Sequence, residues 1–242
     1  METALELLRM THVGAGFIGL AAFWVPIFTR KGAKYHRLFG KIFKYCAYIV
    51  LGAAFLAVVY HMTSALQRGI GPAQNPTQFA FLVFLGYLSV VTFIGLRHGL
   101  HVLKQKPDLI RMNRPLDNGL ALLAIAASLG LIAYGLYFSP PNKILLFALS
   151  PIGFGIGFGA RKAIHGKRLE KKAWFYEHMG AMMGTGIAFH TAFAVFGSTR
   201  IFDLGLEGWV AVIPWITPAL IGIPAITIWT KYYQRKFGDL PA

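Results

Sequence analysis

The sequence predicts an all-α, polytopic membrane protein of seven transmembrane helices. Of its 242 residues, 56% are hydrophobic, and they are grouped into runs rather than scattered. A run of roughly 20 apolar residues crosses a hydrocarbon core of ~30 Å, and seven runs come close to that length. The longest loops have about a dozen residues, which is too short for an independent domain. We therefore expect residues 1–242 to form a single helical-bundle domain.

The seven runs are expected to follow one another across the membrane. Their approximate bounds are Leu5–Phe28, Ile42–Leu66, Phe79–Leu103, Pro115–Phe138, Ile144–Ala160, Ala173–Gly197 and Trp209–Trp229. The first run has no basic segment before it and no small-residue cleavage site after it, so we interpret it as a retained helix. Prolines in the last run are expected to distort it, but no run reads as clearly broken at mid-membrane.

Basic residues alternate between loops and so predict the orientation. Twenty of the 24 lysines and arginines fall at the first, third and fifth loops and in the C-terminal tail. The other four are Arg9, Arg68, Lys143 and Arg200. The positive-inside rule then places the N-terminus outside and the C-terminus in the cytoplasm. The net charge of +15 belongs to these loops and not to a soluble surface, so a nucleic-acid partner is excluded.

Glycines recur at four-residue spacing in two of the predicted spans. Gly153 and Gly157 form one such pair, and Gly180 and Gly184 form another. Small residues four apart create a flat strip along which a second helix can approach closely. Close helix packing is the favoured interpretation, although a flat cofactor or a quinone ring needs the same clearance.

Six of the eight histidines lie inside predicted spans, where ionisable groups are costly and suggest function. With the predicted topology they fall into two layers. The outer layer contains His12, His61 and His190, and the inner layer contains His98, His101 and His178 together with the carboxylates Asp117 and Glu177.

Two histidine layers in a glycine-rich bundle predict a b-type haem electron-transfer protein, with quinone as a candidate partner. Imidazole ligates haem iron, and a haem held between helices takes one histidine from each of two neighbours. The expected axial ligands are the three outer histidines for one site and His98 and His178 for the other, with His101 as an alternative. However, His178 and His190 are about 120° apart around their helix, so one of them is expected to face elsewhere.

Three alternatives use the same residues differently. His12, His61 and His190 could form an open zinc site of a membrane hydrolase, with water as the fourth ligand. Glu177, His178 and Asp117 could relay protons in a transporter. The chain could also be a cofactor-free accessory or scaffold subunit of a larger membrane complex.

Several familiar classes are excluded by missing motifs. The last span has no lysine before Lys231 at its end, which argues against a retinal protein. The sequence contains no P-loop, dinucleotide-binding glycine motif, nucleophile elbow or HExxH motif. No enzymatic reaction is assigned on this basis.

Two segments resemble uncharacterised families of predicted bacterial membrane proteins. The first is the loop RKGxxxHRxxGK, from Arg30 to Lys41, and the second is WxxxHM, from Trp174 to Met179, followed by Thr191-Ala192-Phe193. The resemblance implies a helical protein of the bacterial cytoplasmic membrane and no particular activity. The likeness covers the first two predicted helices and the sixth. His12, His36 and His178 fall in these matching parts, whereas His190 departs from the pattern.

Overall fold

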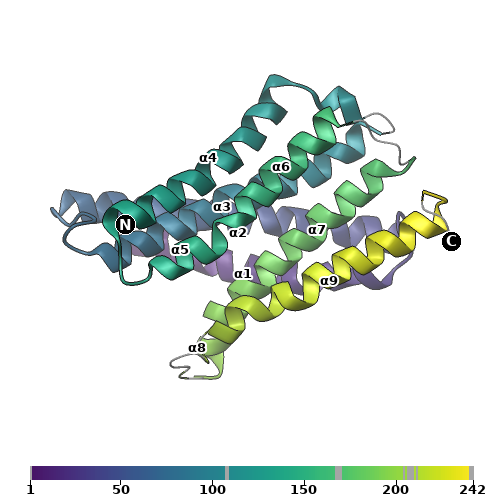
Figure 1. Cartoon of the computed structure of the whole chain (residues 1–242). Coiled ribbons are helices and arrows are strands. Elements are labelled where there is room, and N and C mark those ends of the chain that lie inside the picture. Colours follow the sequence, from purple (N-terminus) through teal and green to yellow (C-terminus); the bar gives the residue numbers. More distant parts are fainter. Residues whose placement is uncertain are drawn as a thin grey trace. The chain divides into compact units, whose positions relative to one another are not determined.

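The computed structural model describes residues 2–106, 109–166, 171–203, 205, 210 and 212–239 (Figure 1). Its α-helices are α1 (Glu2–Phe28), α2 (Lys34–Gln67), α3 (Pro76–His101), α4 (Pro115–Phe138), α5 (Lys143–Leu149), α6 (Pro151–His165), α7 (Ala173–Ala192), α8 (Thr199–Ile201) and α9 (Ile213–Lys236). Two 3₁₀ turns, η1 (Val102–Lys104) and η2 (Leu109–Met112), follow α3, and a π-helical segment, η3 (Phe193–Ser198), follows α7. The described residues contain no strand.

Seven helical segments are long and apolar enough to cross a membrane. They are Thr3–Phe28, Lys34–Gln67, Pro76–Lys104, Pro115–Phe138, Lys143–His165, Ala173–Ile201 and Ile213–Lys236. The all-α, seven-helix membrane architecture is therefore confirmed. The predicted start of the last span, Trp209, lies outside the described residues. The direction in which the helices cross the membrane stays a prediction.

The helices group into two compact units. Unit 1 comprises Met1–Ile94 and Asn113–Ile164, and unit 2 comprises Gly95–Met112 and His165–Ala242. The division falls inside α3, so the last turns of that helix belong to unit 2. We describe each unit separately.

In unit 1, α1 and α2 form a hairpin (Figure 1). The last carbonyl groups of a helix have no partner within the helix and need one from outside it. The Nζ atom of Lys31 donates to the carbonyl oxygens of Pro26, at 2.7 Å, and Ile27, at 2.8 Å. The ring Nδ1 of His36 lies 3.3 Å from the Pro26 oxygen. The basic loop between the helices thus also caps the end of α1.

The fifth span is interrupted at Ser150, which the sequence analysis did not anticipate. Pro151 has no N–H and commonly begins a new helical segment, here α6. The buried hydroxyl of Tyr87 bridges the interruption, because it accepts from the Gly153 N–H at 2.8 Å and donates to the Ser150 carbonyl at 2.9 Å. The Ser128 hydroxyl lies 3.2 Å away. These contacts satisfy backbone groups that the proline leaves without regular helical partners.

Glycines of α6 pack against α4, as the four-residue spacing predicts. A Cβ atom at Gly153 would collide with the Ser128 side chain and lie 2.7 Å from the Ala124 carbonyl oxygen. A Cβ atom at Gly157 would lie 2.6 Å from the Ala121 carbonyl oxygen. These two glycines are therefore needed for the close approach of the two helices.

In unit 2, α7 and α9 lie side by side (Figure 1). A Cβ atom at Gly222 of α9 would collide with the Ile187 side chain of α7, so the helices also approach closely at that level. Near the start of α7, Phe175 makes edge contacts with Tyr233 and Phe237, with ring centroids 4.9 and 5.4 Å away. This aromatic contact joins the start of α7 to the end of α9.

Candidate functional site

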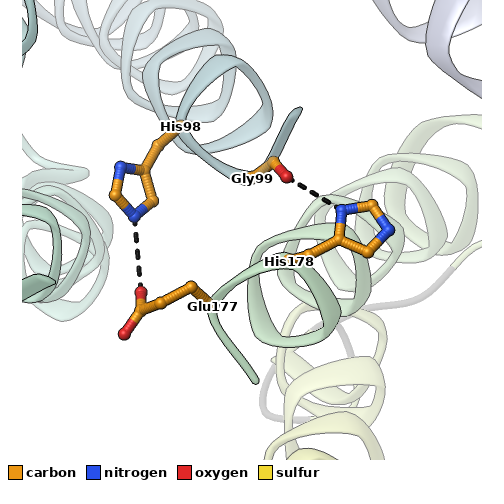
Figure 2. Close-up of polar contacts among 4 residues, drawn as sticks. All are labelled: His98, Gly99, Glu177 and His178. Atoms are coloured by element: carbon orange, nitrogen blue, oxygen red, sulfur yellow. Dashed lines mark hydrogen bonds and ion pairs between the residues drawn. The ribbon is translucent and has the colours of Figure 1, made fainter. Parts of the chain in front are cut away.

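The end of α3 and the start of α7 bring a histidine and a carboxylate together in unit 2. The Nε2 atom of His98 lies 3.3 Å from Oε2 of Glu177 (Figure 2). Both side chains are largely buried, with exposed fractions of 12% and 20%. His98 is three residues before the end of α3, and Glu177 is the fifth residue of α7. At a rise of about 1.5 Å per residue, both lie roughly one helical turn from a helix end.

A second histidine contact lies beside this pair. The ring Nδ1 of His178 is 2.8 Å from the carbonyl oxygen of Gly99 (Figure 2). Because a carbonyl group can only accept, the Nδ1 atom of His178 carries the hydrogen. Residue 99 must be glycine for this approach, since a Cβ atom there would collide with the Cβ atom of Ala181. The bare backbone of Gly99 therefore lets α7 approach near enough for the histidine to bond across.

The two imidazole rings face different partners. Consecutive residues of a helix point about 100° apart, so Glu177 and His178 leave α7 in different directions. In Figure 2 the ring of His98 is turned toward Glu177, whereas the ring of His178 lies against Gly99. The structure gives His98 and His178 separate partners, Glu177 and the Gly99 carbonyl. The predicted inner pair of haem ligands stays a prediction, and no step is derived through a haem.

An acidic residue that the sequence analysis missed fixes the start of α7. The carboxylate of Asp239 accepts from the Tyr176 hydroxyl at 2.6 Å and from the backbone N–H groups of Lys171, at 2.9 Å, and Lys172, at 3.3 Å. Burial alone would raise the pKa of Asp239, but these hydrogen bonds outweigh it and hold the pKa below its usual value. Asp239 thus ties the two residues just before α7, and the Tyr176 side chain in its first turn, to the segment that follows α9.

A cation–π contact supports the same end of unit 2. The Nζ atom of Lys106 lies 4.1 Å from the centre of the Trp174 ring. It joins the segment after η1 to the first turn of α7, next to the turn that carries Glu177. Trp174 belongs to the WxxxHM segment that the sequence analysis singled out, so this contact and the Asp239 contacts place that segment at a tightly held helix start.

The other candidate histidines of unit 2 also have hydrogen-bond partners of their own. His101 is 3.3 Å from the amide nitrogen of Gln105, just after α3. His190 donates from Nδ1 to the Gly186 carbonyl of its own helix, at 2.7 Å. It lies twelve residues beyond His178, which is about 18 Å along a helix.

The candidates of unit 1 are also separated. The Nδ1 atom of His12 lies 3.0 Å from the Val50 carbonyl oxygen, whereas His61 is eleven residues further along α2, or about 16 Å. His61 is exposed and makes an edge contact with the Tyr60 ring. Asp117 is buried in the first turn of α4, with 5% of its surface exposed.

No metal-binding cluster is found in the part of the chain that the structure describes. No three histidine, cysteine, aspartate or glutamate side chains there lie close enough together to hold a metal ion. The zinc site predicted from His12, His61 and His190 therefore stays a prediction without a supporting contact.

Comparisons with known proteins find no match for this chain. The sequence matches no protein-family model, no curated protein and no solved structure. The resemblance of the RKGxxxHRxxGK and WxxxHM segments to bacterial membrane-protein families therefore stays an expectation.

Proposed function

We propose that this chain is a multi-pass membrane protein that exchanges protons through His98 and Glu177. The observation that carries the proposal is the 3.3 Å contact between His98 Nε2 and Glu177 Oε2 near the ends of two membrane-spanning segments. Ionisable side chains within such segments are costly, and they recur where protons are moved.

The chemistry of the pair suits reversible proton binding. Imidazole is the side chain whose ordinary charge change falls between about pH 5 and 8. When both ring nitrogens of His98 carry hydrogen and Glu177 is ionised, the pair holds one positive and one negative charge and is neutral as a whole. Loss of one ring proton leaves Glu177 negative and His98 neutral, so the pair binds or releases one proton while the fold stays in place. The hydrogen bond gives the proton a defined position between the two residues.

The placement of the pair supports exchange with water. Both side chains lie about one turn from a helix end, and both retain some exposed surface. Asp239 and Lys106 hold the start of α7, and therefore the backbone of Glu177, against its surroundings in unit 2. We expect the pair to take up protons from the aqueous side on which the basic loops lie.

The test is proton counting on the purified protein. The number of protons that the protein binds between about pH 5 and 8 is measured by potentiometric titration in detergent. We expect Glu177→Gln to change this titration curve, because the neutral amide no longer stabilises the protonated imidazole. The matched control is Glu6→Gln, an acid whose side chain is 62% exposed. A curve unchanged by Glu177→Gln would refute the proposal.

Haem binding is a second candidate, and one contact favours it. Histidines that ligate a metal usually donate their other ring N–H to a backbone carbonyl or a carboxylate. The bond from His178 Nδ1 to the Gly99 oxygen has that form. On this proposal His178 is one axial ligand of a haem b, and quinone is a candidate partner for electron transfer.

The candidates are separated by an absorption spectrum with metal analysis on the same sample. A Soret band that is lost in His178→Ala and kept in His61→Ala would support haem binding. Stoichiometric zinc without a Soret band would favour the predicted zinc hydrolase. Protein without either cofactor and with an unchanged proton titration in Glu177→Gln would leave the accessory-subunit interpretation.

A further inference from the structure

One face of α9 forms a groove near the C-terminal end of the last span. The groove has a volume of about 710 Å³ and is lined by residues at the i, i+3, i+4, i+7 and i+8 positions of the helix, which share a face. We call it the basic groove, and its residues are Ile228, Lys231, Tyr232, Arg235 and Lys236. This space is open on its outer side, and it is wide enough for a phosphate-bearing headgroup to lie against the helix.

The charge of the basic groove is uncompensated within the described part of the chain. Lys231, Arg235 and Lys236 take part in none of the ion pairs found there. The acid nearest to them in sequence, Asp239, has its carboxylate engaged by Lys171, Lys172 and Tyr176. Within the described residues, therefore, no ion pair neutralises these three cations of α9.

The groove combines these cations with apolar and aromatic surface, from Ile228, through Lys231 and Tyr232, to Arg235 and Lys236 at the end of the helix. Ile228, the residue furthest from the helix end, is apolar and 63% exposed. Tyr232, one turn further on, is 55% exposed, and tyrosine is enriched where hydrocarbon meets headgroups. Arg235 and Lys236 come last, and their long side chains reach into the headgroup layer.

We propose that the basic groove binds the headgroup of an anionic phospholipid. Arg235 offers a planar guanidinium group that matches phosphate oxygens, and the two lysines add charge at either side. Tyr232 lies beside the glycerol region, and Ile228 contacts the start of an acyl chain. Clusters of lysine and arginine next to a membrane-spanning helix attract acidic lipids.

The competing explanation is that these cations keep this helix end on the cytoplasmic side, or interact with the helix dipole, without binding a particular lipid. Cations near the last turn of a helix interact favourably with its dipole without any ligand. That explanation predicts the same lipid dependence for any equally charged helix end. The N-terminal end of α2 offers a comparison, because Lys34, Arg37 and Lys41 are also exposed there.

The test uses full-length protein freed of lipid in detergent and titrated with phosphatidylglycerol or phosphatidylcholine. Binding is measured by native mass spectrometry as the bound fraction against lipid concentration. The groove variant is Lys231→Gln with Arg235→Gln and Lys236→Gln, and the matched control is Lys34→Gln with Arg37→Gln and Lys41→Gln. We expect phosphatidylglycerol to bind at least about tenfold more weakly to the groove variant, and within about twofold of wild type to the control.

Equal weakening in both triple variants, or none in either, would overturn the proposal. If the groove variant does not fold, Arg235→Gln and Arg235→Lys replace it, and binding must fall in the first and be largely kept in the second. In a last experiment, inorganic phosphate is added as a competitor to the wild-type protein with phosphatidylglycerol bound. If phosphate competes for phosphatidylglycerol at similar concentration, the groove is a general anion site and the lipid assignment fails.

Discussion

His12 in unit 1 and His178 in unit 2 make the same hydrogen bond in different surroundings. Each donates from Nδ1 to a backbone carbonyl of a neighbouring helix, at 3.0 Å to Val50 and 2.8 Å to Gly99. Among the described residues, the backbone carbonyl of Val50 is the hydrogen-bond partner of His12. His178, by contrast, follows Glu177, which contacts a further histidine on the same neighbouring helix.

A buried histidine is therefore not by itself a sign of function. A ring N–H bonded to a carbonyl can join two helices and do nothing more, as in unit 1. A carboxylate and a second imidazole at the same level add groups that gain and lose protons. We therefore place the candidate site in unit 2 and regard His12 as a contact that stabilises the α1–α2 hairpin.

Gly99→Ala is expected to have the largest effect on stability, because it prevents the close approach of α3 and α7 in unit 2. The new Cβ atom collides with that of Ala181, and overpacking of this kind costs about 1–3 kcal/mol of unfolding free energy. The control is Gly52→Ala on α2, where a Cβ atom meets nothing within 4 Å. Reversible unfolding in mixed micelles measures both, and equal stability of the two variants would contradict the packing described here.

The two histidine-to-carbonyl bonds are expected to contribute similarly to stability. His12→Ala and His178→Ala should each lower the unfolding free energy by about 0.6–2 kcal/mol, the range measured for polar contacts between membrane helices. The same unfolding assay compares them. A cost for His178→Ala several times that for His12→Ala would mean that His178 holds more than one helix contact in place.

The basic loop of unit 1 provides a smaller test. Lys31→Ala removes the cation that caps the end of α1, and cations at a helix C-terminus contribute about 0.3–1 kcal/mol. Lys34→Ala removes an equal charge from the start of α2, where a cation is unfavourable, and should be neutral or slightly stabilising. Thermal unfolding distinguishes them, and equal shifts would show that Lys31 acts only through net charge.

Asp239→Asn should have the smallest effect, and the size of that effect depends on pH. Because the folded-state pKa of Asp239 is lowered, its ionised carboxylate stabilises the fold above the usual aspartate value of 3.8. That contribution is lost as the pH falls through the lower, folded-state pKa. Wild type should therefore be more stable than Asp239→Asn at neutral pH, and the difference should shrink below about pH 4. A difference that grows on acidification would contradict the hydrogen bonding at the start of α7.

The sequence predicts the spans well because hydropathy is a property of each segment alone. The runs of apolar residues suffice to predict the seven helices, and the glycine spacing in α6 suffices to predict one close packing contact. The interruption at Ser150 was missed because its stabilising partner, Tyr87, comes from another helix. Asp239 was missed for the same reason, since its role depends on bringing the chain end to the start of α7.

The candidate site could be predicted only in part. Membrane burial made His98, His178 and Glu177 candidates, and the structure brings His98 and Glu177 into contact. Grouping histidines by depth alone placed His12 and His61 in one layer, although His61 lies about 16 Å along α2 from the residue that His12 contacts. Depth and rotation around a helix axis both decide whether two side chains meet, and rotation depends on the packing of the neighbours.

Infrared difference spectroscopy of the reconstituted protein between about pH 5 and 8 tests proton exchange by His98 and Glu177. We predict imidazole and carboxylate bands that change together in wild type, that are altered or lost in both Glu177→Gln and His98→Gln, and that persist in His12→Gln. Such a result would show that one coupled pair in unit 2 exchanges the proton. Bands unchanged in the unit 2 variants, or altered equally in His12→Gln, would contradict the account.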